Sequence, residues 1–409
     1  MGLVNLFPLS PSYSSSGSLR QGINRGGSLT GKLNRLALVM TLFFSVLFFF
    51  PMSSFAASAP GVRLKLSYSL EMVREPAVEE VPPIDSPDLW IRIRKGFKLT
   101  DTSPRLTKAH EQQFVKNPGN IPKIIQRGRP YLFHIVEELE SRGMPMEIAL
   151  LPVIESAFNP VALSPMQAAG IWQFIPSTGK FYGLEQTAWY DGRQDILAAT
   201  TAALNYLQKL HAQFGDWNLA LAAYNCGEGC VARALSRTRN SRTLSLPKET
   251  LNYVPKLLAI RNIVLDPQRY GVELGDLPDE PYFSKITLKH PMEAHLAAEL
   301  AGMDMAEFLL LNPAFKRRVI YTNAQNSLLI PIDKVDLFKH NEEKRKTGYL
   351  QHYVAQKGET AAYLSTKFGV TQSWLTRVNP VKFLRGKVPK TQILVVPKSA
   401  NGGGTPFKH

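Results

Sequence analysis

The chain has 409 residues, of which 44% are hydrophobic and 20% are charged. This length allows two or three domains with at least one large core, and the ordinary apolar content excludes a collagen-like or wholly disordered protein. Only two cysteines are present, which excludes a disulfide-rich scaffold. The 48 Lys and Arg outnumber the 33 Asp and Glu, and the net charge of +15 favours an anionic partner or surface.

Residues 1–56 have the pattern of an export signal. Basic residues precede an uncharged apolar run at 36–50, which is shorter than the roughly 20 residues that span a bilayer. Ser54 and Ala56 are small residues that suit cleavage after Ala56. We therefore predict a signal peptide and an exported protein, which argues against a nucleic-acid partner. The alternative is an uncleaved segment that tethers the chain to a membrane.

The sequence changes character near residue 105. Residues 57–104 are rich in proline and predict an extended lead-in, in which Leu89–Ile93 has the composition of a short strand. From 105 to 270, apolar residues recur every three or four positions, which predicts an all-α domain. Proline and glycine positions place its expected helices at 130–143, with Pro130 first, at 195–215, after Asn218 through 223, and near 250–265, with Pro255 near its start.

The C-terminal third contains an internal repeat. Gly302 and Asn312 in the first copy align with Gly369 and Asn379 in the second copy at the same spacing. Glycine is a helix stop, and each copy is flanked by strand-like segments, so each copy predicts a βααβ unit. The predicted boundaries are 281–333 and 351–398, with a charged mobile linker at 334–350 and a flexible tail at 399–409.

Glu155 is the main candidate for chemistry. It is the only charged residue between Glu147 and Lys180, and it follows an apolar stretch at 150–154. Burial in an apolar cleft raises the pKa of a carboxyl group, and a carboxyl group that stays protonated near neutral pH can donate a proton to a leaving oxygen. The alternative is a carboxylate that caps a helix or forms a salt bridge.

The residues around Glu155 suit a saccharide site. Ser164 and Gln173 offer hydrogen bonds to hydroxyl groups, while aromatic rings stack on sugar faces. The aromatic candidates are Phe158, Trp172, Tyr182, Trp189 and Tyr190. We expect about half of these rings to lie in the core, as most aromatic side chains do.

Three motifs in the helical region resemble the lytic transglycosylases of the soluble-lytic-transglycosylase, goose-lysozyme-like group. The first motif extends from Glu155 to 184, the second is 223–229 and the third is 253–256. The resemblance implies a mainly α protein with a lysozyme-like catalytic domain at 105–270. It also implies that Glu155 is the sole catalytic acid and base. The sugar subsites would then contain Ser164, Gln173, Tyr224, Asn225 and Tyr253, with Tyr190 added as an aromatic candidate.

Enzymes of this family cut the β-1,4 bond between N-acetylmuramic acid and N-acetylglucosamine in peptidoglycan. Ordinary glycosidases use two carboxyl groups. The resemblance implies instead that the 6-hydroxyl of the muramic acid is the nucleophile and closes a 1,6-anhydro ring. The resemblance implies no metal and no cofactor. The alternatives are a muramidase of the same fold, with Asp191 or Asp195 as a second carboxylate, and a non-catalytic peptidoglycan-binding protein. We interpret Glu228, in a Gly-Glu-Gly turn, as structural.

The second repeat unit resembles the LysM family, whose modules bind glycans that contain N-acetylglucosamine. The first unit departs from the LysM pattern at 290–293 and is a degenerate copy. The implied partners are peptidoglycan strands, and the implied location is the periplasm or envelope of a Gram-negative bacterium. No cysteine near the cleavage region offers a lipid anchor. Cys226 and Cys230 are favoured as free thiols, because so short a loop makes disulfide geometry demanding.

Overall fold

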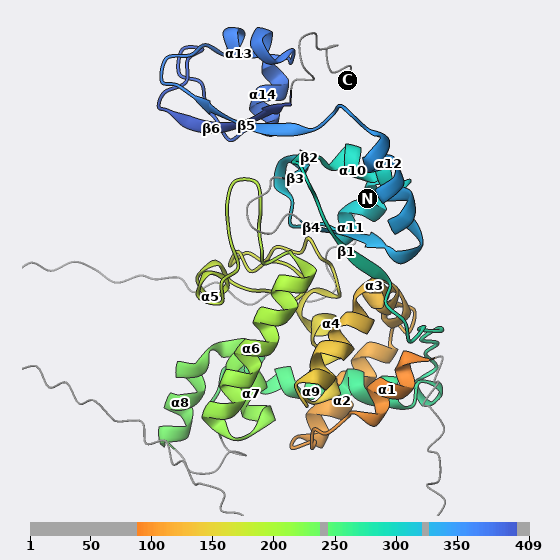
Figure 1. Ribbon diagram of the computed structural model, residues 1–409. Coiled ribbons are helices and arrows are strands. Elements are labelled where there is room, and N and C mark those ends of the chain that lie inside the picture. Colours follow the sequence, from red (N-terminus) through yellow and green to blue (C-terminus); the bar gives the residue numbers. More distant parts are fainter. Residues whose placement is uncertain (1–87, 238–243, 321–326, 399–409) are drawn as a thin grey trace, which may run out of the picture. The chain divides into compact units, whose positions relative to one another are not determined.

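The structure is a computed structural model that describes residues 88–237, 244–320 and 327–398 (Figure 1). The predicted signal peptide, the lead-in up to residue 87 and the tail lie outside these residues. Among the described helices, none combines the length and the apolar character that a membrane span requires. Within the same ranges, no three His, Cys, Asp or Glu side chains are grouped so that they could hold a metal ion.

The part of the chain before residue 271 is helical, which confirms the mainly α prediction. Its elements are α1 (Leu89–Lys95), α2 (Pro104–Val115), α3 (Asn120–Ser141), η1 (Met146–Leu150), α4 (Leu151–Ser156), α5 (Pro176–Phe181), α6 (Ile196–Phe214), α7 (Trp217–Cys226), α8 (Glu228–Arg237), α9 (Lys248–Leu265) and η3 (Gln268–Tyr270). Helix α6 packs against α7, and α9 contacts both α2 and α7 (Figure 1). This packing brings α4, α7 and α9 together, and these three helices carry the candidate site.

The short strand predicted at Leu89–Ile93 is wrong, because these residues form helix α1. The Asp88 side chain accepts a hydrogen bond from the Trp90 backbone N–H at 3.0 Å and so caps the first turn. Leu89, Trp90 and Ile93 are buried together at helical spacing. The extended lead-in therefore does not continue to residue 104.

Two prolines that were predicted near helix starts lie inside helices. Helix α3 begins at Asn120, well before Pro130, and Pro255 lies in the interior of α9. A proline inside a helix costs about 3 kcal/mol or more. Ile121 and Ile125, upstream of Pro130, are buried, and full burial of one such side chain contributes about 1.5–3 kcal/mol. Core packing therefore extends α3 beyond the position that proline alone predicts.

Helix α6 has the predicted bounds, whereas α7 begins earlier than predicted. Asp195 caps α6 by accepting a hydrogen bond from the Ala198 N–H, and Gly215 ends it with a φ of 69°. Helix α7 starts at Trp217, and not after Asn218, because the Asp216 side chain caps its first turn.

The C-terminal third contains the two predicted βααβ units. The first contains β1 (Phe283–Thr287), β2 (Met292–Glu293), α10 (Ala294–Ala301), α11 (Met305–Leu311), η4 (Lys316–Arg318), β3 (Val319–Ile320) and β4 (Ser327–Pro331). The second contains β5 (Leu350–Ala355), α13 (Ala361–Phe368), α14 (Gln372–Val378) and β6 (Gln392–Pro397). Strand β1 pairs with β4, and β5 pairs with β6, both antiparallel.

The aligned asparagines of the repeat form the same pair of hydrogen bonds in both units. The Asn312 side chain donates to the Leu329 carbonyl and accepts from its N–H, at 2.9 and 2.8 Å. The Asn379 side chain forms the same pair of bonds with Val395, at 2.9 and 2.6 Å. Both asparagines are buried, so each ties the end of a helix to the last strand of its unit. This contact explains why an asparagine stands at the same position in both copies of the repeat.

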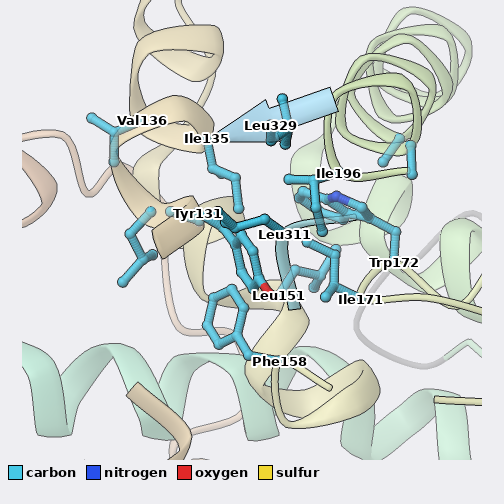
Figure 2. Close-up of a cluster of buried hydrophobic side chains, with 14 of the residues drawn as sticks. Tyr131, Ile135, Val136, Leu151, Phe158, Ile171, Trp172, Ile196, Leu311 and Leu329 are labelled. Carbon is cyan, nitrogen blue, oxygen red and sulfur yellow. The ribbon is translucent and has the colours of Figure 1, made fainter. Parts of the chain in front are cut away.

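The first unit shares one hydrophobic core with the helical domain, whereas the second unit has a core of its own. Figure 2 shows Leu311 and Leu329 of the first unit in one cluster with Tyr131 and Ile196. In addition, the Tyr131 hydroxyl donates a hydrogen bond to the Leu310 carbonyl at 2.8 Å. The first unit is therefore an integral part of the helical domain's packing.

The predicted mobile linker at 334–350 is wrong for most of its length. Residues Val335–Lys344 form helix α12, which packs on α10. Phe338 is fully buried, and the Asn341 side chain donates to the Leu300 carbonyl at 2.9 Å. The many charges of this segment suggested a solvated chain, but a single buried aromatic ring anchors it.

Gly170 has a backbone conformation and a close contact that both require glycine. Its φ is 79°, and a Cβ atom there would lie 2.0 Å from the Arg193 carbonyl oxygen. Gly183 has a nearly equal φ of 78°, but nothing lies within 4 Å of its Cβ position. We expect Gly183→Ala to lower the free energy of unfolding by about 1–2 kcal/mol, and Gly170→Ala to lower it by about 3 kcal/mol or more. Denaturant unfolding of both variants measures the difference, and equal losses would show that the contact with Arg193 has no effect.

Candidate active site

Glu155 lies one residue before the end of α4, a short helix held in the core by Leu151 and Val153. The helix ends because Ala157 and Phe158 adopt positive φ values of 52° and 54°. Phe158 is fully buried and fixes this sharp exit from the helix (Figure 2). Glu155 is half-buried, and its carboxyl group lies in a partly apolar environment.

Helix α9 supplies the direct partner of this carboxyl group. The Tyr253 hydroxyl donates a hydrogen bond to Glu155 Oε1 across 98 residues of sequence. Burial raises the pKa of Glu155 to about 7, while the Tyr253 hydrogen bond and the charge of Lys256 lower it and the charge of Glu249 raises it. Burial dominates, since it removes water from the charged form. Burial and the Glu155 charge also raise the pKa of Tyr253 well above its ordinary value, so Tyr253 remains a donor.

Helix α7 brings Tyr224 and Asn225 to the same region. Burial, followed by the charge of Glu155, raises the pKa of Tyr224 well above its ordinary value. The Tyr224 hydroxyl donates to the Trp172 carbonyl at 2.8 Å, which ties α7 to the loop after α4. Asn225 Oδ1 accepts from the Thr250 hydroxyl at 2.8 Å, which ties α7 to α9. The two polar residues of the second motif therefore connect the helices that hold Glu155 and Tyr253.

Ser164 and Gln173 shape the loop between α4 and α5. The Ser164 N–H donates to the Ala168 carbonyl at 2.9 Å, and the Ser164 hydroxyl accepts from the Ala168 N–H at 3.0 Å. The Gln173 side chain donates to the Gly170 carbonyl at 2.8 Å, and its own backbone has a φ of 51°. A non-glycine residue in this left-handed region stores strain, and such positions cluster at functional sites.

The structure does not gather Tyr190 with Glu155. Its hydroxyl donates to Asp195 Oδ2 at 2.7 Å, and its ring lies 5.7 Å from that of Phe315 in the first LysM-like unit. Among the other aromatic candidates, Phe158 and Trp172 are core residues, as expected for about half of them. Trp189 donates from Nε1 to the Val378 carbonyl at 2.9 Å.

The other candidate carboxylates are engaged in structural contacts. Asp191 is buried and forms two salt bridges, one with Arg193 at 2.7 Å and one with Lys316 at 3.3 Å. Burial by itself raises the pKa of Asp191. The hydrogen bonds from Arg193 and the positive charges of Arg193 and Lys316 outweigh burial, so the pKa of Asp191 is lowered overall. Asp195 caps α6, and Glu228 forms an ion pair with Lys209.

Cys226 and Cys230 form a disulfide, so the prediction of free thiols is wrong. Cys226 ends α7 and Cys230 lies in the first turn of α8. Gly227, with a φ of 89°, turns the chain between the two helices and brings the two Cα atoms to 5.9 Å. This distance lies inside the range of about 4.4–6.8 Å that disulfides require. The glycine-rich turn therefore overcomes the shortness of the loop.

Sequence analysis did not single out the charged residues that act on Glu155 from α9. Glu249 precedes Tyr253 by one turn, and Lys256 follows it by one turn. Residues three and four apart share a helix face. That spacing, applied to the third motif, is the signal that would have identified both residues.

The chain matches two family models and several known proteins. The models are described as Transglycosylase SLT domain, over residues 134–246, and Lytic transglycosylase MltD, LysM-like domain, over residues 282–347. The chain is 34% identical over 315 residues to membrane-bound lytic murein transglycosylase D of Escherichia coli, covering 72% of this chain and 70% of that protein. It is 34% identical over 119 residues to the soluble lytic murein transglycosylase of Salmonella typhimurium, which covers 26% of this chain and 18% of that protein. Among solved structures, the lytic transglycosylase Slt of Pseudomonas aeruginosa is 28% identical in sequence and has a TM-score of 0.28. The aligned region covers 33% of this chain and 24% of the Slt chain.

The raised pKa of Glu155 predicts a pH dependence of stability. The folded state keeps a proton up to about pH 7, whereas the unfolded state releases it near the ordinary value of 4.5. Raising the pH through this window therefore favours unfolding, by up to about 3 kcal/mol. We expect the free energy of unfolding of the wild type, measured relative to Glu155→Gln, to fall by this amount between pH 4.5 and 7. Denaturant unfolding at a series of pH values measures it, and parallel profiles would contradict a raised pKa.

Proposed function

The chain belongs to the lytic murein transglycosylase family, and on that premise we propose that it cleaves the β-1,4 bond between N-acetylmuramic acid and N-acetylglucosamine, with Glu155 as the only acid and base. Family membership confirms the prediction made from the three sequence motifs. The observation that carries the mechanism is the half-buried Glu155 carboxyl group, hydrogen-bonded to Tyr253, with a pKa of about 7. At neutral pH such a group is available both as an acid and as a base.

In the first step, Glu155 donates its proton to the glycosidic oxygen as the bond to C1 of the muramic acid breaks. Tyr253 donates to Oε1 of the carboxyl group, which leaves Oε2 to hold the transferred proton. The same hydrogen bond stabilises the carboxylate that forms. The Tyr253 hydroxyl is already in position before the reaction, so it stabilises the negative charge that develops on Glu155 in this partly apolar environment.

In the second step, the Glu155 carboxylate takes the proton of the muramic acid 6-hydroxyl while the oxygen attacks C1. A 1,6-anhydro ring closes, the other product keeps the glycosidic oxygen as a hydroxyl group, and Glu155 is protonated again. No water is consumed. The nucleophile belongs to the substrate, so no second carboxylate is needed. The structural contacts of Asp191, Asp195 and Glu228 support this single-carboxyl mechanism.

We further propose that Ser164, Gln173, Tyr224 and Asn225 line the sugar subsites next to Glu155. Tyr190 is left out of this group because its hydroxyl bonds Asp195. In the second LysM-like unit, we propose binding of N-acetylglucosamine units, which raises the local concentration of glycan strands around the catalytic domain. Residues 1–56 carry four basic and no acidic residues, so the exported chain keeps +11 of the net charge of +15, which favours attraction to an anionic cell wall.

We propose that the protein acts in the envelope of a Gram-negative bacterium. Support comes from the export signal predicted at 1–56 and from relatives named membrane-bound murein transglycosylases. An uncleaved signal would tether the chain to the membrane.

Replacing the catalytic carboxyl group tests the activity. We expect Glu155→Gln to lower the rate of soluble product release from purified peptidoglycan by a factor of about 10²–10⁴, because the amide cannot transfer the proton. Mass spectrometry of the products released by the wild type should show 1,6-anhydromuramic acid ends. The matched control is Glu228→Gln, the same change in the ion-paired carboxylate, which should keep the wild-type rate. Reducing ends would indicate a muramidase, and no release from the wild type would favour a binding protein.

The hydrogen bond of Tyr253 has an effect on the pH–rate profile. This bond lowers the pKa of Glu155, so its removal in Tyr253→Phe should raise that pKa. Glu155 must be protonated to act as the acid. We therefore expect the alkaline limb of kcat/KM to move to higher pH in the variant, with a lower maximum rate because the carboxylate loses its donor. An alkaline limb at the wild-type position would show that Tyr253 does not act on Glu155.

A further inference from the structure

A cavity of about 370 Å³ lies between the start of α6 and the first LysM-like unit. Glu155 does not line this cavity, so it is separate from the catalytic centre. Its lining mixes hydrogen-bonding side chains with aromatic rings. The lining side chains that matter here are those of Tyr182, Asp195, Thr201, Asn205, Lys285 and Phe315.

Three tyrosine rings lead from the catalytic centre to this cavity. Tyr224, whose pKa responds to the charge of Glu155, has its ring centroid 5.4 Å from that of Tyr206. The Tyr206 centroid is 5.0 Å from that of Tyr182, and Tyr182 lines the cavity. All three tyrosine residues are half-buried. Next to them, the ring of Phe181 is 77% exposed and lies 5.2 Å from that of Tyr182.

The walls of the cavity are fixed by contacts between the helical domain and the first LysM-like unit. The Asp191 N–H donates to the Ala314 carbonyl at 2.9 Å, and the Lys316 N–H donates to the Trp189 carbonyl at 2.6 Å. Tyr190 lies behind the wall, where its ring packs on Phe315 and its hydroxyl binds Asp195. The first unit therefore supplies one side of a preformed cavity.

The side chains that line the cavity suit a ligand that is a neutral, polar ring. The Asp195 carboxylate already accepts hydrogen bonds from the Tyr190 hydroxyl and the Ala198 N–H. Lys285 contributes one cation, which is insufficient for a polyanion site, and the described residues offer no metal-binding cluster. Hydroxyl and amide groups beside an aromatic ring suit a saccharide, whose C–H face packs on the ring while its hydroxyl and acetamido groups form hydrogen bonds.

We propose that this cavity, together with Tyr182 and Tyr206, forms a second saccharide site, which binds the same glycan strand at a sugar unit away from the cleaved bond. The proposal rests on the proposed function, because it extends the substrate that Glu155 cleaves. It gives Tyr182, one of the aromatic candidates of the first motif, a place in a defined site. It also assigns two new roles: Tyr206 binds sugar, and the first LysM-like unit completes the substrate groove of the catalytic domain.

The test is the dependence of affinity on strand length. Calorimetry with the full chain in the Glu155→Gln background measures binding of peptide-free glycan oligosaccharides of increasing length, without turnover. We expect the affinity to rise when the oligosaccharide becomes long enough to reach the cavity. Tyr182→Ala should reduce this rise by about fivefold to tenfold, since an aromatic contact contributes about 1 kcal/mol or more.

Two further variants separate binding from misfolding. Tyr182→Phe keeps the ring and should retain most of the rise. Thr201→Trp places a large side chain in the cavity from an exposed position on α6 and should reduce the rise while all three tyrosines remain. The matched control is Tyr282→Ala, which removes a 42% exposed tyrosine that does not line the cavity.

The outcomes are distinct. A rise that is the same in Tyr182→Ala and Thr201→Trp as in the parent would overturn the second site and would assign the length dependence to the second LysM-like unit. Equal losses in Tyr282→Ala and Tyr182→Ala would also overturn it, because the effect would not depend on the cavity. Absence of binding at every length would instead contradict the proposed function itself.

Discussion

The hydrogen bond between Tyr253 and Glu155 is the interaction on which the candidate active site depends. Helix α4 has only 6 residues, a length at which an isolated helix is unstable in water. The position of α4 is therefore determined by packing. The Glu155 side chain is held in place by the hydrogen bond from Tyr253 on α9. Burial opposes ionisation of Glu155 more strongly than the Tyr253 hydrogen bond favours it, and the resulting pKa of about 7 leaves both the acid and the base form populated at neutral pH. A site with more burial would have only the acid form, and one with more donors only the base form.

The repeat in the C-terminal third shows how two copies of one unit can take different positions in a protein. Asn312 and Asn379 make the same paired hydrogen bonds to the last strand, so the internal structure of the unit is retained in both copies. The surroundings differ. The first copy shares the core of the catalytic domain, and the second has a separate core. The departure of the first copy from the LysM pattern fits a unit whose surface is used for packing.

Local sequence patterns were sufficient for α6 and for both βααβ units. In these places capping residues, periodicity and glycine stops all agree. The errors arose where a distant contact decides the structure. Leu89–Ile93 is helical because its apolar residues enter a core built from later segments. Similarly, Tyr190 and Trp189 were placed among sugar-binding aromatics, but both are engaged by residues of the LysM-like units, more than a hundred positions later.

The disulfide between Cys226 and Cys230 gives one turn of this protein two covalent forms. Thiols stay reduced in compartments with active glutathione or thioredoxin systems and pair in oxidising ones. A bridge over so few residues removes little freedom from the unfolded chain, equivalent to about 2 kcal/mol. Its effect is therefore local. It fixes the direction in which the chain leaves the helix that carries Tyr224 and Asn225, so the end of that helix is held covalently only where the two thiols are oxidised.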